Sequence, residues 1–94
     1  MDKVIEVQRY RLLSIEAWRY PDGWSWNNAF YCYDVFIPVR ASNRLILKML
    51  RAMGALTDHS KGRVRIDEYG VGCLEIQNKS TGEPLFALEV VGND

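Results

Sequence analysis

The chain has little of the residue types that build disulfide and metal sites. Its 94 residues include one histidine and two cysteines, Cys32 and Cys73, which belong to no C-x-x-C or Cys/His cluster. Neither a disulfide framework nor a structural zinc site is indicated, and we expect two buried thiols in a reducing compartment. No apolar run approaches the roughly 20 residues that span a bilayer, and the first residues lack the apolar segment of a signal peptide, so we expect a cytoplasmic protein.

The formal net charge is zero, whereas dedicated nucleic-acid binders are strongly basic. The charges are nevertheless unevenly distributed. Residues 1–66 hold eleven Lys/Arg against six Asp/Glu, and residues 67–94 hold one lysine against six Asp/Glu. Two outcomes are open: the blocks form two faces and give the molecule a dipole, or strand pairing interleaves them.

The composition is that of an ordinary globular domain. Hydrophobic residues make up 48% and charged residues 26% of the chain. These fractions argue against disorder and against a fibrous protein, and the length suits one modest core. We therefore expect one α+β domain over residues 1–94.

Hydrophobic periodicity predicts five strands and one helix in the order β-β-α-β-β-β. The fold class expected is a single antiparallel sheet with one helix packed on one face. The strands are predicted at 4–20, 24–39, 63–69, 72–77 and 85–91. The helix is predicted to follow Ser42 as N-cap and to run to about Ala52 or Met53, with Gly54 as its stop.

Two local features shape the first hairpin. Pro21-Asp22-Gly23 supplies a fixed φ, an Asx-type side chain and a residue free to adopt positive φ, so it predicts the turn between the first two strands. The Asn27-Asn28 pair predicts a bulge or break in the returning strand.

The predicted helix has an apolar side and a basic side. We expect the buried stripe to be Leu45, Met49, Ala52 and Met53, continued by Leu56 and flanked by Ile46 and Leu50. On another side lie the basic residues Arg44, Lys48 and Arg51, with Arg40 one turn earlier. This basic stripe suits phosphates or an acidic protein surface, although a merely solvated helix face is the simpler interpretation.

Two short motifs resemble catalytic or cofactor signatures without their context. Asp58-His59-Ser60 has the letters of a hydrolase triad, but adjacent loop residues cannot line up nucleophile, base and orienting acid. Gly70-Val71-Gly72 lacks the third glycine and the following helix of a phosphate-binding loop, so it predicts a turn. We therefore expect no catalytic, cofactor or metal residues and no enzymatic activity.

Aromatic residues crowd into one segment. Seven of the eleven, including all three tryptophans, lie between Trp18 and Tyr33. One helix covers only one face of a sheet, so an excess of aromatic side chains should stay partly exposed, either Tyr10, Trp18 and Tyr20 or else Trp24 and Trp26. An exposed aromatic patch usually marks an interaction site or an oligomer contact.

The stretch RLLSIEAWRYPDGWSWNNAF resembles small accessory proteins of bacteriophages and prophages, through an "AWR…GW-WN" pattern in the first third of the chain. Anti-defence and anti-CRISPR inhibitors are the studied examples of that group. The resemblance implies a non-enzymatic protein that binds a host factor in the host cytoplasm. It implies no catalytic residues.

The sequence as a whole favours stoichiometric binding to a protein partner, with homo-oligomerisation as a further expectation. The predicted contact residues are Trp18, Tyr20, Trp24, Trp26, Arg40, Arg44, Lys48 and Arg51. The alternative is a nucleic-acid-binding module in which the basic stripe follows phosphates and Trp or Tyr stacks on bases. A small enzyme or ligand-binding domain is the third hypothesis, for which no site is visible.

Overall fold

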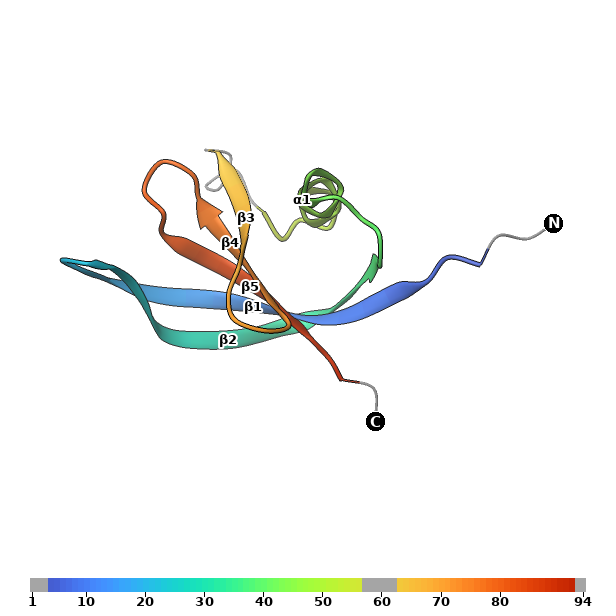
Figure 1. Ribbon diagram of the computed structural model, residues 1–94, viewed down its shortest axis with the longest axis horizontal. Helices are drawn as coiled ribbons and strands as arrows, with labels where there is room; N and C mark the ends of the chain where they lie inside the picture. The colour runs from blue at the N-terminus through green and yellow to red at the C-terminus, as the bar shows by residue number, and fades with distance from the viewer. Residues whose placement is uncertain (1–3, 57–62, 93–94) are drawn as a thin grey trace.

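The chain forms a five-stranded antiparallel sheet and one short helix (Figure 1) in the computed structural model, which describes residues 4–56 and 63–92. The sheet order is β2-β1-β5-β4-β3. The elements are β1 (Val7–Tyr20), β2 (Gly23–Pro38), α1 (Asn43–Ala52), β3 (Val64–Glu68), β4 (Cys73–Asn78) and β5 (Pro84–Val90). The predicted order of elements is confirmed.

The first hairpin has the predicted turn and the predicted bulge. Gly23 has a φ of 138°, a conformation that side chains disfavour, so glycine suits this end of the turn. The β1/β2 register shifts between Glu16 and Ala17, opposite Asn27. A second shift, opposite Cys32, was not predicted. Such bulges bend and twist a strand pair, so the long hairpin departs from a flat ribbon.

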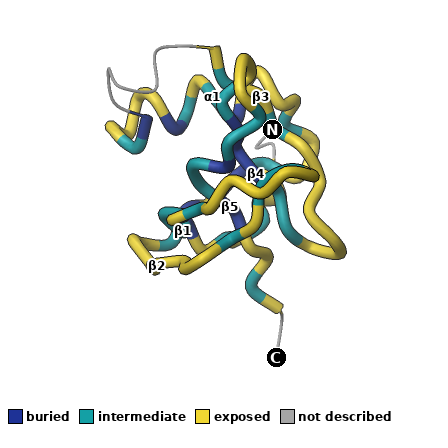
Figure 2. The backbone as a smooth tube through the Cα atoms, turned by 90° about the vertical axis from the view of Figure 1, so that its left-hand side faces the viewer, coloured by how far each residue is buried: buried dark blue, intermediate teal, exposed yellow. Residues whose placement is uncertain are grey.

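The core lies on one side of the sheet. Leu12 of β1 faces the same side as Leu88, its partner in β5, and Leu88 in turn pairs with Leu74 of β4. The buried cluster joins strand and helix residues, namely Leu12, Val35, Ile37, Ile46, Leu50, Leu56, Ile76 and Leu88. Figure 2 shows the buried positions gathered where α1 and the central strands meet, while much of the hairpin is exposed. We call the side of the sheet that carries Leu12 the helix side and the other the back.

The helix buries a different stripe from the one predicted. Ile46 and Leu50 are buried, whereas Leu45 and Met53 are 40% and 44% exposed, Ala52 is exposed and Met49 is half-buried. The apolar residues of this helix form two overlapping stripes, and i, i+4 spacing alone does not determine which stripe is buried. Burying Ile46 and Leu50 turns Arg44 and Lys48 to solvent, because residues two apart in a helix lie on nearly opposite sides.

Both ends of the helix are capped as predicted. The Ser42 hydroxyl accepts a hydrogen bond from the Leu45 amide at 3.1 Å, which satisfies one of the free N–H groups of the first turn. At the other end Gly54 has a φ of 78°, and the Leu56 amide bonds back to the Leu50 carbonyl. This return brings Leu56 into the core. No helix in the described part of the chain is both long and apolar enough to cross a membrane.

Candidate interaction surface

Trp18 and Tyr20 form an exposed aromatic pair at the tip of the β1/β2 hairpin. They are 58% and 51% exposed and share the helix side with Leu12. A helix of 10 residues is about 15 Å long, whereas a strand of 14 residues spans about 46 Å, so β1 is far longer than α1. We call this pair the tip aromatics.

Trp24 and Trp26 lie on the back of the sheet and make contacts within the molecule. The Trp24 indole N–H donates to the Thr81 carbonyl at 3.1 Å, and the guanidinium of Arg19 lies 5.4 Å from the centre of the Trp24 ring. Trp26 stacks on Tyr69, with ring centroids 4.3 Å apart and an interplanar angle of 10°. Both tryptophans are half-buried.

A chain of polar contacts continues from Trp26 across the back of β4. The Trp26 indole N–H donates to Glu75 Oε2 at 2.6 Å, and Gln77 Nε2 donates to Glu75 Oε1 at 2.6 Å. Arg65 Nε in turn donates to Gln77 Oε1 at 2.7 Å. Glu75 is only 6% exposed, so its carboxylate depends on these donors in place of water.

The Trp26–Glu75 bond shows how far the hairpin bends. Two strands, β1 and β5, separate β2 from β4 in the sheet. In a flat sheet three strand spacings would place these strands about 14 Å apart, too far for a direct side-chain hydrogen bond. The hairpin therefore curls over the back of the sheet, and Ala87, fully buried on β5 opposite both Leu13 and Glu75, leaves room there.

The basic stripe is exposed along its whole length. Exposed side chains are found at all four positions, Arg40, Arg44, Lys48 and Arg51. The ion pairs within residues 4–56 and 63–92 are Arg9–Asp34 and Arg11–Glu89, and neither involves the stripe. Figure 1 places α1 away from the hairpin tip along the longest dimension of the molecule, which measures 54 Å. The tip aromatics and the basic stripe are thus two separate surfaces.

The charges of the two sequence blocks are partly interleaved. Arg11, from the basic block, pairs with Glu89 from the acidic block at 3.7 Å across β1 and β5. Arg9 Nε donates to Asp34 Oδ2 at 2.8 Å, and the Tyr31 hydroxyl donates to Oδ1 of the same carboxylate at 3.0 Å. Hydrogen bonds from Arg9 and then Tyr31 hold the pKa of Asp34 below its ordinary value, and donating to Asp34 raises the pKa of Tyr31.

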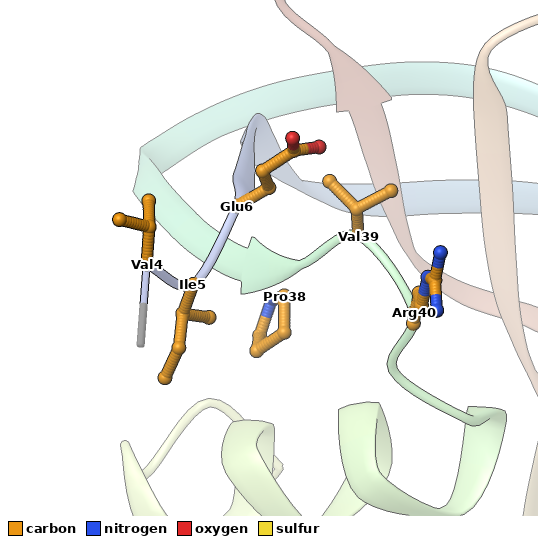
Figure 3. Close-up of a pocket in the computed structure, with 6 residues that line it drawn as sticks. All are labelled: Val4, Ile5, Glu6, Pro38, Val39 and Arg40. Carbon is orange, nitrogen blue, oxygen red and sulfur yellow. The ribbon is translucent and has the colours of Figure 1, made fainter. Parts of the chain in front are cut away.

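The depressions on the described surface are open. One of about 360 Å³ lies between the first described residues and the end of β2, and is lined by Val4, Ile5, Glu6, Pro38, Val39 and Arg40. In Figure 3 Ile5 and Pro38 point toward α1, whereas Glu6 and Val39 point the other way. Its lining offers one carboxylate and one guanidinium, and no nucleophile.

Of the two motifs singled out in the sequence, the structure describes only one. Asp58-His59-Ser60 lies outside the described residues. Gly70 and Gly72 have φ values of 67° and 73° in the turn between β3 and β4, which confirms the predicted turn. Within the described ranges no three His, Cys, Asp or Glu side chains come together as metal ligands.

The expectation of two buried thiols is wrong for Cys32. It is exposed on β2, while Cys73 is half-buried. The cause is the position of β2 at the sheet edge, together with the bulge opposite Cys32, which the sequence did not reveal. Burial raises the pKa of the Cys73 thiol, and the nearby carboxylates Glu89 and Glu75 add to that effect.

Comparison of the chain with family models, curated proteins and solved structures found no match. Of the eight predicted contact residues, Trp18, Tyr20 and the four basic residues are exposed, and Trp24 and Trp26 are occupied by internal contacts. The partners of Trp26 are not predictable from the sequence, since Tyr69 and Glu75 lie more than 40 residues further along the chain.

Proposed function

We propose that this chain is a non-enzymatic binding protein that contacts a protein partner stoichiometrically through the tip aromatics. The observation that carries the proposal is the exposure of Trp18 and Tyr20 at 58% and 51% on a strand that extends past the helix. Tryptophan and tyrosine are enriched among the residues that dominate binding energy at protein interfaces.

The basic stripe adds a second contact surface of defined charge. This part of the proposal takes α1 to cover one face of the sheet through Ile46 and Leu50, which leaves Arg44 and Lys48 toward solvent. A partner with an acidic patch would be steered toward it during encounter. The resemblance to phage accessory proteins suggests a host factor as partner and the host cytoplasm as its location.

A pull-down with the tagged chain from host cells, with and without nuclease, tests this proposal. We expect one protein partner that is recovered in both samples at a fixed ratio to the bait. The variants Trp18→Ala and Tyr20→Ala should each weaken recovery. Recovery that stays unchanged in both variants would contradict the role of the tip aromatics.

Nucleic-acid binding is the second candidate, and the basic stripe favours it. Four exposed cations without a carboxylate partner in the described residues can follow a phosphate backbone. Titration of fluorescent single- and double-stranded oligonucleotides at low and moderate salt tests it. Affinity that falls steeply with salt, and falls further in Arg44→Ala, supports this candidate, and no binding at low salt removes it.

A further inference from the structure

The two edges of the sheet differ in how well they are protected against pairing with another strand. β3, at one edge, has five residues, and three of them, Arg65, Asp67 and Glu68, are charged. β2, at the other edge, has 16 residues, and Asp34 is its only charged one. Short strands and charged side chains are the usual means of blocking edge-to-edge association. β2 has neither.

The exposed edge is also rich in aromatic residues. Four side chains of β2, namely Phe30, Tyr31, Tyr33 and Phe36, are between 39% and 60% exposed. At 150–250 Å² for each whole side chain, this leaves about 400 Å² of aromatic surface per chain uncovered. Two such surfaces hold at most about 800 Å² before the strand backbone is counted, below the ~1,000 Å² of a typical specific interface, so the association expected is a weak one.

From these observations we propose that β2 pairs antiparallel with β2 of a second copy of this chain, which joins two sheets into one of ten strands. The sole charge of the strand, Asp34, already pairs with Arg9, so two copies can approach without unpaired like charges. A two-fold dimer places the same surface on both sides of the contact and therefore needs a self-complementary edge. The inference does not depend on the proposed function.

The bulge at Cys32 indicates the register. Phe30 pairs with Ser14 and Tyr33 with Leu12, and Ser14 and Leu12 share the helix side because they are two residues apart on β1. Phe30 and Tyr33 therefore share a face although they are three positions apart. A two-fold axis between Tyr31 and Cys32 sets Phe30 of each copy opposite Tyr33 of the other, which forms two cross-strand aromatic pairs.

The experiment compares oppositely charged double variants by analytical ultracentrifugation from micromolar to millimolar concentration. Wild-type chain should reach about twice 10.9 kDa, with a dissociation constant on the order of micromolar to tens of micromolar. Phe30→Lys/Tyr33→Lys and Phe30→Glu/Tyr33→Glu should each associate on the order of a hundredfold more weakly, because like charges replace the aromatic pairs. An equimolar mixture of the two variants should again form dimers.

Val71→Lys is the matched control, since it adds a charge at a fully exposed apolar residue in the turn between β3 and β4, outside β2 itself. It should dimerise like wild type. Amide hydrogen exchange of the wild-type chain gives a reading that needs no variant: protection within residues 29–35 should rise with concentration. A wild-type chain that stays monomeric at millimolar concentration overturns the proposal, as does a dimer that persists in both double variants.

Discussion

The carboxylate of Glu75 and the indole of Trp26 form a 2.6 Å hydrogen bond between residues 49 positions apart in the chain. This contact joins the curled hairpin to the centre of the sheet. It also explains how a buried carboxylate is tolerated on β4, since Gln77 donates to its second oxygen.

Replacement of that carboxylate by an amide should destabilise the protein. In Glu75→Gln, one of the two oxygens becomes an NH₂ group that faces a donor, either the Trp26 indole or the Gln77 amide. We expect the free energy of unfolding to fall by about 1–3 kcal/mol, the cost of a buried donor without an acceptor. Urea denaturation measures it. Glu89→Gln, at an exposed site, is the control and should change stability by less than about 0.5 kcal/mol.

The orientation of the helix can be tested with a pair of leucines. Leu50→Ala should lower the free energy of unfolding by about 2–5 kcal/mol, because Leu50 is 1% exposed and its removal leaves a cavity. Leu45→Ala, at a 40% exposed site, should cost much less. Equal losses of stability in the two variants, measured by thermal and urea denaturation, would support the buried stripe predicted from the sequence.

Asp34 should make the stability of the hairpin dependent on acid pH. Its pKa in the folded chain lies below the ordinary value of 3.8, so the stabilisation from Arg9 and Tyr31 is present above that value and is lost as pH falls through the folded-state pKa. We expect wild type to melt higher than Asp34→Asn near pH 6. The difference should narrow as pH falls below 3.8. A difference in melting temperature between wild type and Asp34→Asn that does not change with pH would show that the Arg9–Asp34 ion pair does not cause it.

The two thiols should react with alkylating reagents at different rates. In a dilute, monomeric sample at pH 8, exposed Cys32 should be modified quickly, and half-buried Cys73, whose pKa is raised by burial, slowly. Mass spectrometry after timed quenching identifies the modified residue. Cys32→Ser should remove the fast phase alone, and loss of the slow phase instead would reverse the assignment.

Binding and stability should separate at the tip aromatics. Trp18→Ala should weaken association with the protein partner about thirtyfold, equivalent to about 2 kcal/mol, while the melting temperature stays nearly unchanged. Trp26→Ala is the comparison, because its ring stacks on Tyr69 and its N–H bonds to Glu75. It should destabilise the fold. Loss of association in proportion to loss of stability in both variants would mark Trp18 as structural.

Local patterns in the sequence were enough to predict the elements but not their mutual arrangement. Ser42, Gly23 and the Asn27 bulge act through the backbone of their own neighbourhood, so their effects are visible in a short window. The choice of Ile46 over Leu45 depends instead on how the helix docks against strands elsewhere in the chain.

The candidate surface was predictable only in part, for the same reason. The sequence predicts that some aromatic side chains remain exposed, because one helix covers only one face of a sheet. Which side chains remain exposed depends on the curl of the hairpin. The curl brings Trp26 into contact with Glu75 and Tyr69 and leaves Trp18 exposed. The exposure of Cys32 likewise depends on strand order, which no local pattern encodes.

The length of chain between Trp26 and its partners has a kinetic consequence. The β1/β2 hairpin can form from a local turn, whereas the stacking of Trp26 on Tyr69 needs a loop of more than 40 residues to close. Because Trp18 stays more than half exposed in the folded chain, the change in indole fluorescence during refolding should come mainly from Trp24 and Trp26. That signal therefore reports the docking of the two halves of the chain, and it should lag behind the circular dichroism of the hairpin.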